Sequence, residues 1–446
     1  MRKGNSMRTV HVRRRGYVMR KCVGALCIAA AILFSLTGCE KPSDSQQEIR
    51  FSWWGGDSRH QATITATELF TAAHPDISVR TEYGAWSGWE DAASAALYAG
   101  TEADVMQVNR NWLTDYSSDT SGFLDLREYS NIIDLTQYEP DVLEMCTVNG
   151  KLLAVPVSRT GRVFLWNETT YQQAGLPVPD SFSALCAAGS VFQETLGSDY
   201  YPLALGWYDR MLFLVYLLQC EYGREWVADG KLQYTQAEIE EGLSRIMALE
   251  QNHVIPPLKQ IAGGGADSFD KDENYITGKY AGIFEWDSSA GKFISALSSG
   301  QTLTVGEFFQ DLGSYHGGFS KISLGFAISR HTKYPEACAE LISALISDPE
   351  IVRTLGTERG IPLNHKAYEI CSQAGLLGDI SAQANRCMTD WVQFRIDPDF
   401  EHASLKGVNG VYEDVFTGLS YGDYSVSQAA ERLCAGIQAA VSGESS

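Results

Sequence analysis

Hydrophobic and polar positions along most of the chain follow two periods, one typical of strands and one typical of helices. Residues 49–53 and 77–83 alternate apolar and polar side chains, as half-buried strands do. Residues 61–73 and 91–99 follow these two segments and have the composition and spacing of helices. The apolar segment 104–108 predicts a buried strand. Strand, helix, strand, helix, strand is the order of a mostly parallel α/β sheet.

The middle and the end of the chain continue this alternation. We predict strands at 152–156, 162–166 and 324–328, a turn at 158–161, and amphipathic helices at 237–250 and 335–348. Pro335 suits the first turn of the last of these helices, because proline lacks the N–H that a helix start leaves unpaired. No segment after the N-terminal region reaches 18 consecutive apolar residues, so we expect no membrane span there.

The first 38 residues have a different pattern, which is typical of an export signal. Residues 1–21 contain eight Lys and Arg and no acid, and an apolar run at 22–36 follows. A basic head, a short apolar run and small residues after it indicate a secretory signal. We expect residues 1–38 to be removed and the polar residues 39–47 to form a flexible tether.

The segment Leu36-Thr37-Gly38-Cys39 resembles the lipobox of bacterial lipoproteins. In that class the cysteine takes a diacylglycerol and becomes the mature N-terminus. The resemblance therefore implies lipidation of Cys39. An ordinary cleaved signal followed by a chance cysteine is the alternative.

Composition excludes several classes of protein. The chain has 446 residues, a length that suggests two or three domains. Its 55 acidic and 35 basic residues give a formal net charge of −20, which disfavours nucleic acid as a partner. An anionic chain is also repelled by an anionic membrane, so a lipid would have to be its anchor. Seven cysteines follow Cys39 without a CxxC motif, which favours buried free thiols over disulfides or metal ligands.

Catalytic motifs are absent from the sequence. There is no HExxH, no GxSxG and no P-loop, and the acidic group at 267–273 lacks the register of an EF-hand. We therefore predict no catalytic residue, no cofactor and no metal. A glycosidase remains the enzyme alternative, because its paired carboxylates meet only in the folded chain.

Five segments in the same order resemble the sugar-binding class of bacterial solute-binding lipoproteins, which serve ATP-binding-cassette (ABC) importers. They are 49–63 (IRFSWWGGDSRHQAT), 102–112 (EADVMQVNRNW), 150–167 (GKLLAVPVSRTGRVFLWN), 279–287 (KYAGIFEWD) and 324–362. Together they span most of the chain after the tether. One departure is Pro179-Asp180-Ser181-Phe182, which stands where the class commonly has a Thr-Trp segment.

The resemblance implies an α/β fold with two lobes, a periplasmic-binding-protein-like architecture whose hinge the chain crosses more than once. The N-terminal lobe would take residues 48–157 and 300–368, and the C-terminal lobe residues 158–299 and 369–446. A ligand would be held in the cleft between them, which closes by hinge bending. The implied protein is a monomeric extracytoplasmic lipoprotein, attached to the cell membrane through its lipid only. It would deliver a carbohydrate to an ABC permease.

A saccharide has an apolar C–H face and a rim of hydroxyl groups. A site for it needs flat aromatic faces together with planar polar groups, and in an open α/β sheet such groups lie beyond the carboxyl ends of the strands. Most candidates follow predicted strands, and relatives place a stacking tryptophan at the position of Trp286. The candidates for ligand contact are Trp53, Trp54, Asp57, Arg59, Trp86, Trp89, Asn109, Asn111, Arg159, Trp207, Trp286, Asp287 and Tyr412.

Each candidate has a structural alternative. Trp53 and Trp54 are equally compatible with a core position. Asp57 and Arg59 suit a loop ion pair or a helix cap, and Asn109 and Asn111 suit a turn. The same fold also binds peptides or polyamines in other proteins, or acts as a sensor. The tryptophans near predicted strand ends favour an uncharged saccharide.

Overall fold

The computed structural model describes residues 46–115, 122–262 and 269–442. The predicted signal peptide, the lipidation site Cys39 and all but the last two residues of the predicted tether lie outside these ranges. Within the described ranges, no helix combines the length and the apolar character that crossing a membrane requires.

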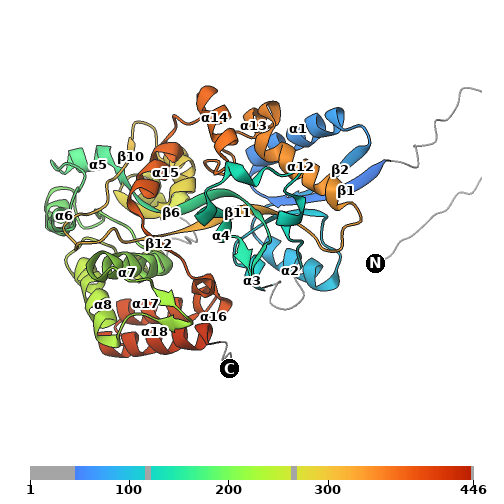
Figure 1. Ribbon diagram of the computed structural model, residues 1–446. Helices are drawn as coiled ribbons and strands as arrows, with labels where there is room; N and C mark the ends of the chain where they lie inside the picture. The colour runs from blue at the N-terminus through green and yellow to red at the C-terminus, as the bar shows by residue number, and fades with distance from the viewer. Residues whose placement is uncertain (1–45, 116–121, 263–268, 443–446) are drawn as a thin grey trace, which may run out of the picture. The chain divides into compact units, whose positions relative to one another are not determined.

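An eight-stranded mixed sheet organises the chain (Figure 1). Its order is β10-β6-β11-β3-β1-β2, with β9 paired to β6 and β12 paired to β11. β2, β1 and β3 are parallel, and β11 runs antiparallel to β3. The sheet strands are β1 (Gln47–Trp54), β2 (Ile77–Gly84), β3 (Val105–Val108), β6 (Val155–Asn167), β9 (Gly282–Trp286), β10 (Leu303–Val305), β11 (Phe319–Ile328) and β12 (Phe394–Arg395). Two hairpins lie apart from it, β4 (Thr147–Val148) with β5 (Lys151–Leu152) and β7 (Val227–Ala228) with β8 (Lys231–Leu232).

Helices connect and cover these strands. Those of the first 200 residues are α1 (Asp57–Ala73), α2 (Trp89–Ala99), α3 (Trp112–Asp115), α4 (Pro140–Glu144), α5 (Glu168–Gln173) and α6 (Phe182–Thr195). The middle of the chain adds α7 (Trp207–Tyr222), α8 (Gln236–Gln251), α9 (Leu258–Ala262), α10 (Glu273–Ile276) and α11 (Ala290–Ala296). The last part contains α12 (Pro335–Ser347), α13 (Pro349–Leu355), α14 (His365–Gln373), α15 (Ile380–Trp391), α16 (Ala403–Lys406), α17 (Val411–Tyr421) and α18 (Val426–Val441).

The alternation predicted at the start of the chain is confirmed. β1, α1, β2, α2 and β3 follow one another, and β1 pairs in parallel with both β2 and β3. The later helices predicted from apolar stripes correspond to α8 and α12. Pro335 is the first residue of α12, as its missing N–H suggests.

The turn predicted at 158–161 is wrong. β6 is one continuous strand, and Ser158, Arg159, Thr160 and Gly161 are all paired with β11. The small and polar residues there tolerate a register shift in the partner strand between Ile322 and Gly325 rather than a reversal of the chain. The error arises because Ser, Thr and Gly are typical of turns when no partner strand is considered.

The described chain has two large hydrophobic cores. The first is built from β1, β2, β3, the start of β6, the end of β11 and α12, and the second from the end of β6, β9, α7, α8, α17 and α18. Val155 belongs to the first core and Val163, on the same strand, to the second. Ile322 and Phe319 divide β11 in the same way. β6 and β11 therefore run from one core to the other, as expected of the hinge of a two-lobe fold.

The boundaries of the two lobes stay a proposal. The predicted division assigns residues 300–368 to the N-terminal lobe, yet Leu303, Phe308 and Phe319 pack in the second core. We propose that the chain crosses between the lobes within β6 and within β11, because these two strands contribute side chains to both cores.

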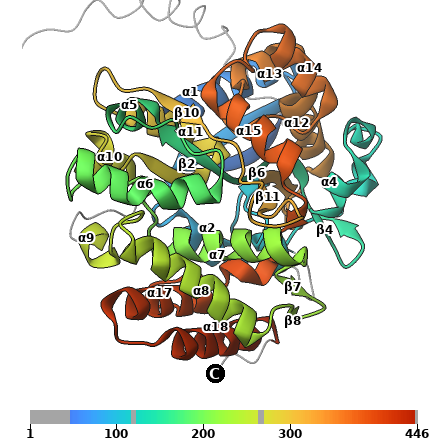
Figure 2. The same ribbon diagram turned by 90° about the vertical axis from the view of Figure 1, so that its left-hand side faces the viewer.

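A buried ion pair joins the helices of the second core. Figure 2 shows α8, α17 and α18 close to α7. Arg210 of α7 is completely buried, and its Nη1 donates to Glu250 Oε2 of α8 at 2.5 Å. The Ser420 hydroxyl of α17 donates to the same oxygen at 2.9 Å. Because a buried charge is tolerated only when it is paired and hydrogen-bonded, this contact holds the three helices in register.

Candidate functional site

A pocket with a volume of about 950 Å³ lies in the part of the chain that forms the second core. Its walls come from β6, β9, α7, α9, α11, α16 and α17, which are far apart in the sequence. The aromatic lining residues are Trp207, Tyr208, Phe269, Trp286, Phe293 and Tyr421. The charged lining residues are Arg162, Asp209, Glu285, Lys292, Lys406 and Glu413. This volume is in the range of sites that hold organic ligands.

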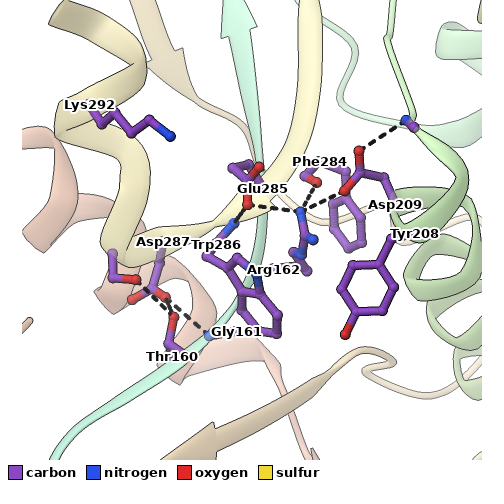
Figure 3. A network of polar contacts seen from close by, with 12 residues as sticks. Thr160, Gly161, Arg162, Tyr208, Asp209, Phe284, Glu285, Trp286, Asp287 and Lys292 are labelled. Carbon is purple, nitrogen blue, oxygen red and sulfur yellow. Dashed lines mark hydrogen bonds and ion pairs between the residues drawn. The ribbon is translucent and has the colours of Figure 1, made fainter. Parts of the chain in front are cut away.

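Arg162 is the central polar residue of the pocket (Figure 3). It is 6% exposed, and its Nη1 donates to Phe284 O at 2.6 Å and to Glu285 Oε1 at 2.9 Å. The same nitrogen lies 3.0 Å from Asp209 Oδ1. Two carboxylates therefore hold one guanidinium, which fixes its plane against the pocket wall. Arg162 Nε is buried and has no hydrogen-bond partner among the described residues.

Burial controls the protonation of Asp209. Burial raises the pKa of this carboxyl, the Arg162 guanidinium lowers it and the Glu285 carboxylate raises it, and the net pKa is about 6. The Gly206 amide donates to Asp209 Oδ2 at 3.0 Å and lowers the pKa slightly. Asp209 therefore titrates close to neutral pH, unlike an exposed aspartate.

Trp286 has two cations near its ring. The Arg162 guanidinium carbon lies 4.7 Å from the ring centre and Lys321 Nζ lies 4.8 Å from it. Arg162 and Trp286 are register partners on β6 and β9, so both side chains leave the sheet on one face. Cations at this distance are attracted to the indole face, which holds the ring in place.

Glu401 holds the second pair of basic groups together. This residue of the 3-10 helix η5 (Pro398–Glu401) accepts from Lys321 Nζ, from Lys406 Nζ at 2.6 Å and from Tyr208 Oη at 3.0 Å. Burial alone would raise the pKa of Glu401, but the two ammonium groups outweigh burial and hold the pKa far below its usual range. Glu401 therefore stays ionised at physiological pH.

These contacts form a closed ring of six side chains. Trp286 contacts Arg162 and Lys321, Glu401 joins Lys321 to Lys406, and Lys406 Nζ lies 4.6 Å from the centre of the Tyr208 ring. Arg162 closes the ring at 5.8 Å from Tyr208. Every cation has an anionic partner, so the ring is rigid without a large excess of charge. Aromatic faces beside fixed donors and acceptors are what a saccharide needs.

Two of the predicted contact residues line this pocket. Trp207 and Trp286 are both half-buried, with the Trp207 ring 5.7 Å from that of Tyr208. Their accessible surface faces the charged residues described above. The structure thus brings these two tryptophans together from α7 and β9, which are separated by much of the chain.

Three predicted contacts, Trp53, Asp287 and Tyr412, are buried and do not line the pocket. Trp53 is completely buried in the first core, where its Nε1 donates to His60 Nδ1 at 3.1 Å. Asp287 is buried under β6 and accepts from Gly161 N at 3.1 Å and Asn385 Nδ2 at 2.6 Å. Tyr412 is buried in the second core. In this structure each of the three is engaged in packing or hydrogen bonding within the protein.

Two candidates, Trp54 at the end of β1 and Trp86 after β2, form a separate aromatic cluster with Trp112, which was not among the predicted contacts. The Trp54 ring lies 5.1 Å from Trp86 and 5.4 Å from Trp112. Glu90 accepts from Trp112 Nε1 at 2.8 Å. Trp86 is 43% exposed and so retains an accessible face. The carboxyl ends of the parallel strands do bring these rings together, as the sheet rule predicts, but none of them lines the large pocket.

The other predicted residues have local partners. Trp89 packs against the first core, Asn111 Nδ2 lies 3.5 Å from Glu90 Oε1, and the Asn109 side chain accepts from the amide of Arg110 at 2.8 Å. Asp57 is exposed at the start of α1. Arg59 and Arg159 each take part in a hydrogen bond to a main-chain carbonyl. Arg59 Nε donates to Glu358 O at 2.8 Å, and the carbonyl of Arg159 accepts from Asn385.

Sequence reasoning missed most of the polar ring. Its unpredicted members are Arg162, Tyr208, Lys321, Glu401 and Lys406. The one signal in the sequence is Arg162, a charge directly before the apolar segment 163–166. Lys321, Glu401 and Lys406 give no such signal, because their partners are defined only by the fold.

Comparison with known proteins relates this architecture to a family. The profile of a family described as bacterial extracellular solute-binding protein matches residues 65–377. The chain belongs to this family. One curated relative is a protein from Brucella abortus that is named as a putative binding protein. It is 23% identical to this chain over 143 residues. That match covers 31% of this chain and 33% of the relative, so the chain spans about a third of the length of the curated relatives it matches.

Solved structures of solute-binding proteins share the fold along their whole length. A periplasmic solute-binding protein from Pectobacterium atrosepticum is 31% identical, with a TM-score of 0.83 over 89% of this chain and 99% of its own. A periplasmic oligogalacturonide-binding protein from Yersinia enterocolitica, in complex with saturated digalacturonic acid, is also 31% identical, with a TM-score of 0.82 over the same shares. The predicted two-lobe α/β fold of this solute-binding family is therefore confirmed.

Proposed function

We propose that this solute-binding protein captures an oligosaccharide outside the cytoplasm and delivers it to an ABC permease. The observation that carries this proposal is the arrangement around Trp286. An indole ring and two further aromatic residues, Trp207 and Tyr208, share one pocket with fixed carboxylates and a guanidinium. A sugar ring stacks on such faces while its hydroxyl groups reach the planar polar groups.

The basic residues of the pocket favour an acidic saccharide within this class. Lys292 and Lys406 line the pocket with side chains 49% and 39% exposed, so a ligand carboxylate can reach both ammonium groups. Arg162 Nε is a further buried donor. The Yersinia enterocolitica relative binds digalacturonic acid, which carries such carboxylates. This refines the earlier expectation of an uncharged ligand, which is kept as the alternative outcome of the test.

Isothermal titration calorimetry on the mature chain, residues 39–446 without lipid, tests both levels of the proposal. We expect digalacturonic acid to bind with micromolar affinity, about −8 kcal/mol. A neutral digalactose of the same linkage should bind at least tenfold more weakly. Tighter binding of the neutral sugar would overturn the acidic refinement and leave saccharide capture intact. No binding to a library of neutral and acidic oligosaccharides would overturn the function itself.

Lysine variants separate charge recognition from stacking. Lys292→Gln and Lys406→Gln each remove one ammonium group, and we expect each to lower affinity for the acidic sugar about three- to tenfold. Neither should change affinity for the neutral sugar. Lys333→Gln, which lies outside the pocket lining, is the matched control and should alter neither affinity.

Binding without turnover distinguishes this role from the glycosidase alternative. Incubation of the purified chain with the bound oligosaccharide, followed by chromatography of the sugars, should return the starting material unchanged. If shorter sugars are released, and this activity stays with the protein through further purification, the glycosidase alternative is favoured.

The lipid anchor and the extracytoplasmic location belong to the same proposal. They are supported by the lipobox-like segment that ends at Cys39 and by the family's extracellular description. Mass spectrometry of the mature protein from bacterial membranes should find a diacylglycerol on Cys39. Cys39→Ala should release the protein from the membrane fraction, and an unchanged membrane attachment of this variant would contradict the anchor.

A further inference from the structure

A second, much smaller cavity lies in the part of the chain that carries the first core. Its volume is about 40 Å³, enough for more than one water-sized probe. Most of its wall is apolar and comes from β6, β11, α12 and α13. Its polar side chains are those of Arg359, Asn364 and Tyr138. The proposed oligosaccharide site uses none of these residues.

The guanidinium of Arg359 is buried with two of its nitrogens unpaired. The residue is 6% exposed, and its Nε donates to Gln107 Oε1 at 2.9 Å. Nη1 and Nη2 have no hydrogen-bond partner among the described residues. The guanidinium carbon lies 5.5 Å from the centre of the Phe326 ring, another part of the cavity wall. A buried cation without a bonded counter-ion costs several kcal/mol.

Neighbouring charges compensate for this cation only in part. Glu358 is next to Arg359 in sequence, but its carboxylate accepts a hydrogen bond from Ser58 Oγ at 2.9 Å at the surface. The second guanidinium nearby, that of Arg59, repels Arg359. Burial and this repulsion outweigh the opposing effect of the Glu358 carboxylate and lower the pKa of Arg359 well below its usual value.

The other two polar groups also carry hydrogens that they can donate. Asn364 Oδ1 accepts from Ala367 N at 3.0 Å and caps α14, which leaves its Nδ2 as the free end of the amide. Asn364 Nδ2 and Tyr138 Oη are both buried, and among the described residues their only hydrogen-bonding interaction is with each other: the amide lowers the pKa of Tyr138, which burial raises above its usual value. The cavity wall thus offers three N–H-bearing nitrogens and one hydroxyl group.

We propose that this cavity binds a small inorganic anion, and that chloride is its occupant. An anion accepts hydrogen bonds from all four groups and neutralises the guanidinium. A water molecule has two hydrogens that would need acceptors; Arg359 and the capped Asn364 amide offer none there, and the Tyr138 oxygen can accept only one of them. The small volume and apolar wall exclude large organic anions.

Bound chloride would stabilise the end of β1 as well as the cavity. Gln107 accepts from Arg359 and its Nε2 donates to Trp54 O at 3.2 Å. Arg59 Nη1 donates to the same carbonyl. A bound anion that holds Arg359 in place therefore also holds Gln107 and, through Gln107, the carbonyl of Trp54 in the aromatic cluster.

Thermal unfolding of the mature chain in sodium chloride and in sodium gluconate, at equal ionic strength, tests the proposal. We expect the Tm to rise saturably with chloride by about 3 °C, because the ligand binds only the folded state. Gluconate is too large for the cavity and should give no such rise. A Tm that is equal in the two salts at every concentration would overturn the chloride site.

Asn364→Asp is the decisive variant, since replacing Arg359 could simply prevent folding. Aspartate keeps the cap of α14 and brings its own carboxylate to the guanidinium. Its Tm should exceed that of the wild type in gluconate and should no longer depend on chloride. Asn131→Asp, the same change at an exposed position, should keep the chloride dependence. A chloride dependence retained by Asn364→Asp would place the effect elsewhere.

Bromide supplies a direct observation. In crystals grown with sodium bromide, an anomalous difference peak within hydrogen-bond distance of Arg359 Nη1 or Nη2 supports the site. A cavity that contains only ordinary water density under the same conditions overturns it.

Discussion

Arg162 and Trp286 face each other across neighbouring antiparallel strands, with the guanidinium carbon 4.7 Å from the centre of the indole ring. The pairing unites the two properties that a saccharide site needs. Trp286 supplies an apolar face, and Arg162 supplies a charge that two carboxylates orient. Because β6 also runs into the first core, this pair lies on one of the strands that connect the two cores.

Trp286→Ala should weaken oligosaccharide binding without unfolding the protein. The ring is half-buried and lines the pocket, so its loss removes a stacking face of about 1–3 kcal/mol, or roughly five- to 150-fold in Kd. Calorimetry gives the affinity and circular dichroism the fold. Trp286→Phe keeps an aromatic face and should lose less. Unchanged affinity in a folded Trp286→Ala protein would show that the ring is not a platform.

Arg162→Met should destabilise the protein as well as abolish tight binding. The substitution leaves Asp209 and Glu285 without their buried cation, at a cost of about 3 kcal/mol in the free energy of unfolding. Urea titration measures this cost. Arg432→Met removes an exposed pair with Asp414 and should cost less than about 1 kcal/mol. Equal costs for the two variants would contradict the central role of Arg162.

Asp209 should make stability fall as the pH rises. Its folded pKa of about 6 lies above the value near 3.9 of an unfolded aspartate, so the native state binds this proton more tightly. The contribution is complete below about pH 4 and is lost as the pH rises through about 6. Relative to Asp209→Asn, the wild type should lose up to about 3 kcal/mol between pH 4 and 7. Urea titrations across this range measure the difference, and a constant difference would disprove the raised pKa.

Glu401→Gln should show the opposite pH dependence. The folded pKa of Glu401 lies below that of an unfolded glutamate, so its stabilising effect is present above about pH 4 and is lost as the pH falls. At pH 7 the variant leaves Lys321 and Lys406 without their shared counter-ion and should lose about 3 kcal/mol of unfolding free energy. The difference from the wild type should shrink in acid.

The same urea titrations provide the control for this pair of charges. Asp414→Asn alters an exposed carboxylate whose partner is also exposed, and it should change stability by less than about 1 kcal/mol at either pH. A Glu401→Gln variant that behaves like Asp414→Asn would show that the buried carboxylate does not organise the two lysines.

Local structure was well determined by the sequence alone. The alternation in 49–53 and 77–83 and the helical spacing of 335–348 depend on which side chains face a core, and that periodicity is written in the order of residues. β1, β2 and α12 follow it closely. The order of residues does not show in the same way which strands pair with each other. Residues 158–161 resemble a turn until β11, which is distant in sequence, lies alongside and continues the strand.

The polar ring was decided by the tertiary structure. Tyr208 and Glu401 are 193 residues apart, and Lys321 and Glu401 are 80 apart, yet each pair is hydrogen-bonded. Tryptophans stand out in a sequence because they are rare and large, so Trp207 and Trp286 were predicted. Tyr412 shows the limit of such a prediction, since burial in a core and exposure in a pocket differ only in what packs against the ring. Lysines and glutamates acquire a role only when folding removes them from water and gives them one another as partners.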